Sequence, residues 1–82
     1  MINYRLAEFR CLIRGWDNGD ERFDEIVECA ISIWPAGRQA LANKFQVADS
    51  TVGRWMSGVA RPAPRLKRLI VGFLRQKLLS SG

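Results

Sequence analysis

The chain has 82 residues and a mass of 9.3 kDa, which is enough for one small domain and too little for a multidomain enzyme. Its composition, 48% hydrophobic and 26% charged, is that of an ordinary globular protein and argues against wholesale disorder. It contains no histidine, the commonest general acid–base group and metal ligand, so we expect neither an enzyme nor a metal or cofactor site. The formal charge of +5 favours an anionic partner.

The location of the protein can be predicted from its apolar runs and its cysteines. No apolar run approaches the roughly 20 residues that a membrane span needs, and the N-terminal segment has no cleavage signal. We therefore expect a cytoplasmic protein that does not enter a membrane. Cys11 and Cys29 have no further Cys or His nearby to complete a zinc site. Both fall within apolar helical patterns, so we interpret them as reduced residues in or near the core rather than as a disulfide.

The charge is divided unevenly along the chain. Residues 1–35 carry four basic and seven acidic side chains, whereas residues 36–82 carry nine basic side chains and a single acid, Asp49. A polyanion would therefore bind the second part of the chain. The acidic first part is either a solvated helix surface or a surface that recruits another protein.

Apolar periodicity predicts an all-α fold, a compact bundle of about five helices in a single domain spanning residues 1–82. The first helix covers 2–16, and the second runs from a cap at Asp20 to Trp34, where Pro35 ends it. Two short helices follow over 39–45 and from Asp49 or Ser50 to about Ser57. The last helix covers 64–79. No segment alternates with the period of a strand.

Three groups of apolar residues are expected to have defined places in this bundle. The tryptophans Trp16, Trp34 and Trp55 fall on apolar stripes and are interpreted as core residues rather than as base-stacking platforms. Val71 and Leu79 lie off the main face of the last helix, which favours a partner helix from a second copy. That main face consists of Leu66, Leu69, Ile70, Phe73, Leu74 and Leu78.

The two short helices, joined by about three residues, have the pattern of a helix-turn-helix. Small Ala42 lets the two helices approach closely, and Val52 and Trp55 face back from the second helix. Leu41, Phe45 and Val47 fill the space beneath. The residues left facing outward are Asp49, Ser50, Gly53 and Arg54.

Residues 38–58, about a quarter of the chain, resemble the helix-turn-helix of the lambda-repressor-like family of phage repressor, Cro and related regulators. The matching residues are Ala42, Ser50, Thr51, Val52, Trp55 and Gly58. Two positions depart from the family pattern: Gln46 stands where the family often has Gly, and Ala48 where it often has a polar N-cap. Either Gln46 adopts a left-handed conformation or the turn differs. The family accounts for a helix at 20–34 but not for the first helix, and this chain has one long last helix where many members have two.

The resemblance implies that Asp49, Ser50 and Arg54 approach base edges in the major groove, with Thr51 close to the DNA backbone. The chemistry agrees for Arg54, which can make a bidentate contact to guanine. Asp49 could accept a hydrogen bond from cytosine N4, but so close to phosphates we expect it rather to exclude wrong sequences or to cap its helix. Backbone phosphates would be bound by Arg38 and Gln39 at the start of the first motif helix, and by Lys44, Arg61 and Arg65 beside it.

The basic residues of the last helix have two interpretations. They either contact phosphate or keep the outer side of an apolar helix in solution. These residues are Arg65, Lys67, Arg68, Arg75 and Lys77.

The sequence therefore predicts a small, sequence-specific DNA-binding regulator of transcription of phage or bacterial type, such as a repressor, that binds double-stranded DNA as a homodimer. The alternative is a protein-binding module on a helix-turn-helix scaffold, similar to an antitoxin or anti-repressor. Such a module would use its acidic N-terminal half or its C-terminal helix. Salt dependence of binding separates the two hypotheses, because phosphate contacts weaken steeply with salt.

Overall fold

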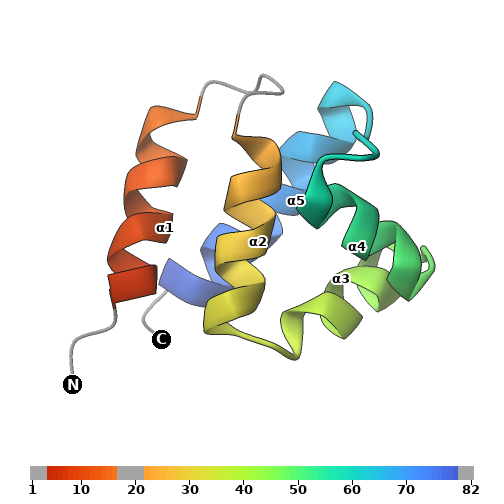
Figure 1. Ribbon diagram of the computed structural model, residues 1–82, viewed down its shortest axis with the longest axis horizontal. Coiled ribbons are helices and arrows are strands. Elements are labelled where there is room, and N and C mark those ends of the chain that lie inside the picture. The colour runs from red at the N-terminus through yellow and green to blue at the C-terminus, as the bar shows by residue number, and fades with distance from the viewer. Residues whose placement is uncertain (1–3, 17–21, 80–82) are drawn as a thin grey trace.

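The structure, a computed structural model, describes residues 4–16 and 22–79 and contains α-helices and no strands in these ranges (Figure 1). This confirms the all-α class and the bundle of about five helices. The helices are α1 (Tyr4–Gly15), α2 (Phe23–Ile33), α3 (Gly37–Phe45), α4 (Asp49–Ser57) and α5 (Pro64–Leu79). None of the helices in these ranges is long and apolar enough to cross a membrane.

The central helix of the bundle is α2, which packs against each of the other four helices. In Figure 1, α1 lies antiparallel to α2 on one side, α3 and α4 lie on the other, and α5 passes behind. A helix that contacts neighbours on several sides must be apolar on several sides. The buried residues of α2 are accordingly Phe23, Ile26, Val27, Cys29, Ala30 and Ile31.

The ends of α2 differ in part from the prediction. The helix begins at Phe23, after Arg22 in a left-handed conformation (φ 66°) that provides no side-chain cap. The predicted cap, Asp20, lies outside the described residues. At the other end the helix stops at Ile33 because Pro35 disfavours a helical conformation at the residue before it. Gly37 then begins α3 directly against the ring of Trp34, where a Cβ atom would lie 2.8 Å from Cε3.

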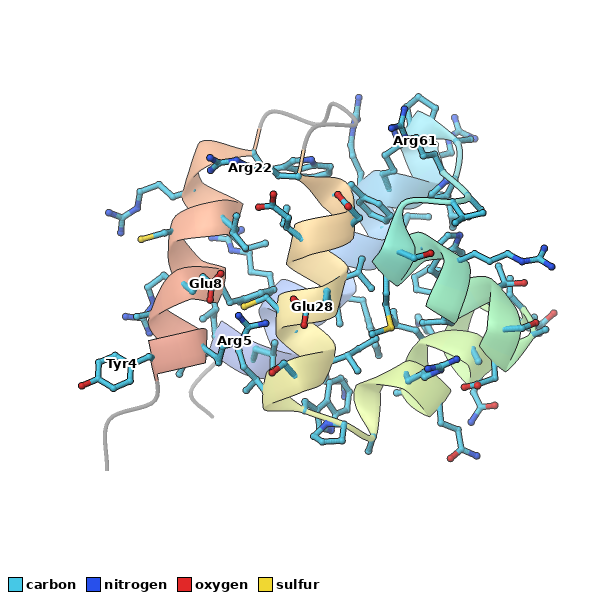
Figure 2. All side chains as sticks on the ribbon, viewed as in Figure 1. Tyr4, Arg5, Glu8, Arg22, Glu28 and Arg61 are labelled. Carbon is cyan, nitrogen blue, oxygen red and sulfur yellow. The ribbon has the colours of Figure 1, made fainter. Side chains whose placement is uncertain are left out.

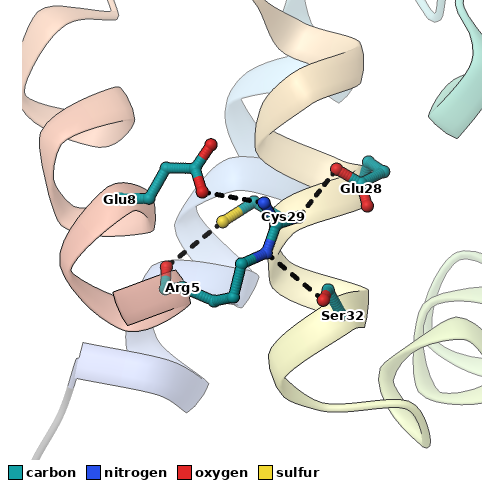
Figure 3. Close-up of polar contacts among 5 residues, drawn as sticks. All are labelled: Arg5, Glu8, Glu28, Cys29 and Ser32. Carbon is teal, nitrogen blue, oxygen red and sulfur yellow. Dashed lines mark hydrogen bonds and ion pairs between the residues drawn. The ribbon is translucent and has the colours of Figure 1, made fainter. Parts of the chain in front are cut away.

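One arginine fixes α1 to α2 (Figures 2 and 3). The guanidinium of Arg5 donates hydrogen bonds to Glu8 (2.7 Å), to Glu28 (2.8 Å) and to the hydroxyl of Ser32 (3.3 Å). The hydrogen bond to Glu28 raises the pKa of Arg5. In addition, the Cys29 thiol donates to the Arg5 carbonyl oxygen over 3.2 Å. The first helix is therefore attached to the bundle by specific polar contacts as well as by the buried side chains of Phe9 and Leu12.

The C-terminal helix is attached through aromatic contacts. The ring of Phe73 lies 6.3 Å from that of Trp34 and 6.1 Å, edge-on, from that of Phe45, distances typical of favourable ring pairs. The ammonium of Lys77 lies 5.7 Å from the centre of the Phe73 ring on the same helix. These contacts hold α5 against the ends of α2 and α3.

The prediction for the cysteines was half right. Cys29 is buried, but Cys11 is exposed, and both thiols are free. The reason is that α1 packs mainly against α2 and α5, and its buried residues are Phe9 and Leu12. The core interpretation of the tryptophans is confirmed, because Trp55 is buried and Trp16 and Trp34 are half-buried against the core.

The buried face of α5 is rotated from the predicted one. Leu69, expected to face the core, is 56% exposed, whereas Val71, expected outside, is 4% exposed. Lys67 is also buried, so it is not a surface cation that could contact phosphate. The buried face of α5 consists of Lys67, Ile70, Val71 and Leu74. The aliphatic stem of a lysine can cover apolar surface at the end of such a face. The surplus apolar surface of α5 is therefore at Leu69, whereas Val71 is buried and Leu79 is half-buried against the core.

Candidate nucleic-acid interface

The turn between α3 and α4 depends on a left-handed residue. Gln46 has φ 54° and ψ 49°, and the backbone N–H groups of Gln46 and Val47 both donate to the Ala42 carbonyl oxygen. This is the usual way to end a helix when the chain must reverse, although glycine is the usual residue. The left-handed conformation considered from the sequence is therefore confirmed, and it lets residues 46–48 join the two helices.

The inner side of α4 is anchored in the core. Val52 and Trp55 are buried, and the helix packs against both α2 and α3. At its C-terminal end, Gly58 is left-handed (φ 79°), and the N–H groups of Gly58 and Val59 bond to the carbonyl oxygens of Trp55 and Arg54. This hydrogen-bonded end and the buried side fix the helix, and its outer side faces solvent.

An ion pair joins the first turns of α3 and α4. The Nε of Arg38 lies 3.0 Å from the Oδ2 of Asp49, and the two side chains are 41% and 63% exposed. The Nε–H does not point at the carboxylate, so this buried nitrogen has no hydrogen-bond partner among the described residues, and the contact is purely an ion pair. Asp49 therefore does not act as the cap of α4, whose N-cap residue is Ala48.

Gly53 leaves room for the side chain of Arg38, a residue of α3, against the backbone of α4. A Cβ atom at this position would lie 2.8 Å from Nη2 of Arg38, so the guanidinium rests directly against the helix backbone one turn beyond Asp49. Any larger residue at position 53 would push the guanidinium away. The sequence pattern identified Gly53 as outward-facing but gave no signal for this role, because it depends on a contact between two helices.

The remaining predicted contact residues lie on three segments. Ser50 and Arg54 are exposed on α4, where Thr51 is half-buried. Gln39 and Lys44 are exposed on α3. Arg61 and Arg65 are exposed beyond the C-terminal end of α4, and Figure 2 shows Arg61 in the segment that leads to α5. Among the predicted residues, an ion pair joins Arg38 to Asp49.

Comparison with models of known protein families, with curated proteins and with solved structures gave no match to this chain. The resemblance of residues 38–58 to lambda-repressor-like regulators therefore stays a hypothesis. Within residues 4–16 and 22–79, no group of three or more acidic or cysteine side chains is placed to hold a metal ion.

Proposed function

We propose that the chain is a sequence-specific DNA-binding regulator and that α4 enters the major groove as the second helix of a helix-turn-helix. The observation that carries this proposal is the division of α4 into a buried side, Val52 and Trp55, and an exposed polar side with Asp49, Ser50 and Arg54. An α-helix with its side chains is about 10 to 12 Å across and so fits a major groove about 12 Å wide.

The charge distribution supports DNA as the partner. Residues 36–82 have one acidic side chain, and Arg38 pairs with it. Exposed cations at Lys44, Arg54 and Arg65 are then available to neutralise phosphates. The alternative is protein recruitment through the acidic first half, where Arg5 neutralises part of the charge by pairing with Glu8 and Glu28.

Separate roles can be assigned to the polar residues of the two helices. Arg54 would contact guanine, and Ser50 would donate to or accept from a neighbouring base. Arg38, held beside the first turn of α4, would contact a phosphate at that point, with Gln39, Lys44, Thr51, Arg61 and Arg65 as further backbone contacts. Asp49 would keep Arg38 in position, and its negative charge would repel a phosphate group next to it.

A single α4 helix can contact only a few base pairs, so the regulator is proposed to act as a dimer. Two copies would place their α4 helices in successive major grooves, about 34 Å or one DNA turn apart. A dimer bound at such a site would act by occupancy, as a repressor that blocks polymerase.

Selection from a randomised duplex library at about 0.1 M salt tests this proposal. The expected result is enrichment of an inverted repeat with half-sites about one helical turn apart. Binding without any enriched sequence would contradict a sequence-specific regulator, and absence of binding at low salt would contradict DNA as the partner.

A further inference from the structure

We infer that a hollow between α1 and α5 binds a small organic phosphate. The hollow is lined by Arg10 of α1 and by Gly72, Arg75, Gln76 and Leu79 of α5. It is an open hollow at the surface with a volume of about 460 Å³, and Arg10, Gly72, Arg75 and Gln76 in its lining are exposed. The two helices pack against each other, and in Figure 1 the C-terminal half of α5 lies next to α1 and α2. None of these residues lies on α3 or α4, although Arg75 is one of the last-helix cations considered from the sequence as a phosphate contact.

The charges around the hollow point to an anion. Arg10 and Arg75 bring two positive charges to one hollow, and no acidic side chain of the described residues lines it. In the part of the chain that the structure describes, neither arginine makes an ion pair or a hydrogen bond from its side chain. Arg5, on the same helix as Arg10, is by contrast paired with Glu8 and Glu28. An anion bound in the hollow would be attracted by both charges.

Gly72 is a second, independent observation at the same place. It lies in the interior of a 16-residue helix, although glycine disfavours helix formation. A Cβ atom at Gly72 would meet nothing within 4 Å, so the packing of the fold does not require glycine here. Because residues three and four positions apart are neighbours on a helix, the missing side chain leaves space beside Arg75 and Gln76. The glycine therefore leaves space for a ligand in the hollow.

The lining residues specify the class of ligand. Guanidinium groups present parallel N–H donors that match phosphate oxygens, and the Gln76 amide can donate as well. Leu79 adds an apolar side, which suits the organic part of a phosphate ester rather than free inorganic phosphate. The first helix, which the resemblance to DNA-binding proteins does not explain, would supply one of the two arginines. The inference does not depend on the proposed binding of DNA.

A titration of the full chain with phenyl phosphate, followed by NMR at low salt, tests the inference. Saturable shifts centred on Gly72 and Gln76 are expected, with inorganic phosphate binding more weakly. Arg10→Gln and Arg75→Gln should each weaken binding by about tenfold or more, the effect of losing a hydrogen bond to a charged group. Arg68→Gln is the matched control: it removes the same charge from an exposed position of α5 that does not line the hollow, and it should change binding less than about twofold.

The variant Gly72→Leu distinguishes loss of ligand binding from loss of the fold. It replaces a poor helix former at an open position, so the melting temperature should rise or stay the same while phenyl phosphate binding is lost. Arg54→Ala should leave phenyl phosphate binding unchanged, whatever happens to the binding of DNA.

Three results would overturn the inference. The first is no saturable binding of phenyl phosphate by the unaltered chain. The second is equal weakening by Arg68→Gln, which would mean a general effect of surface charge. The third is that Arg10→Gln and Arg75→Gln weaken duplex DNA binding as much as phenyl phosphate binding, which would assign the hollow to the DNA backbone.

Discussion

The guanidinium of Arg38 lies 3.0 Å from the carboxylate of Asp49 and so connects the first turn of α3 to the first residue of α4. Both side chains are partly exposed, and such pairs stabilise a fold by under about 1 kcal/mol. The main effect of the pair is therefore on orientation. It fixes a cation beside the exposed side of α4 and neutralises the one acid of residues 36–82.

Asp49→Asn tests the role of this pair. Removing a negative charge close to the phosphates should raise the affinity for all duplexes by a few-fold, because more net positive charge faces the DNA. The preference for a selected site over a scrambled one should fall, because the Asp49 carboxylate that would select against wrong sequences is removed. Fluorescence anisotropy on both duplexes measures the two affinities. If both affinities equal those of the unaltered protein, the pair has no role in recognition.

Gly53→Ala should change DNA affinity without reducing the stability of the fold. The new Cβ would lie 2.8 Å from Nη2 of Arg38, and this flexible side chain can move aside, so the fold should keep its stability or gain up to about 1 kcal/mol. DNA affinity should fall by up to about tenfold because the guanidinium is displaced. Gly72→Ala is the control, since a Cβ there meets nothing and only stability should change. Equal DNA affinities for the two variants would refute the role assigned to Gly53.

Gln46→Gly should stabilise the protein by about 1 kcal/mol. Gln46 is left-handed, a conformation that disfavours residues with a Cβ atom but not glycine. Gln46→Ala keeps the Cβ atom and should give no such gain. Urea unfolding followed by circular dichroism measures both changes. A glycine variant less stable than the alanine variant would show that the turn has another conformation.

The two cysteines should differ in reactivity and in their effect on pH stability. Burial raises the pKa of the Cys29 thiol above its ordinary value of 9.0, whereas Cys11 is exposed. Above pH 9.0 the unfolded chain ionises Cys29 before the folded chain does, so the free energy of unfolding falls as pH rises toward the folded pKa. This decline should be smaller in Cys29→Ala. At pH 8, a maleimide should modify Cys11 first; equal rates at both thiols would contradict the burial of Cys29.

Local patterns were sufficient to predict the helices, and contacts between helices were not predictable from them. The five segments followed from apolar periodicity, and Pro35 and Gly58 marked ends that the structure confirms. Periodicity did not show which of two overlapping faces of α5 would be buried. The buried face contains Lys67 as well as Val71, and a charged residue within an apolar face obscures the pattern in the sequence.

The candidate site shows the same limit. Asp49, Ser50 and Arg54 were predicted to face outward because Val52 and Trp55 had to face the core, and the structure confirms this exposure. The ion pair of Arg38 with Asp49, and the space that Gly53 leaves for it, involve side chains on different helices. Such contacts depend on how α3 packs on α4, which no pattern within one helix specifies.

The most direct test of the proposed function is the base preference of Arg54→Ala. The selected duplex and a set with single base-pair changes are titrated with the unaltered protein and with the variant. We predict that the variant binds the selected site more weakly by about 1 to 3 kcal/mol and loses discrimination at one base pair of each half-site. Unchanged affinity and unchanged discrimination at every position would contradict the proposal that α4 reads the major groove.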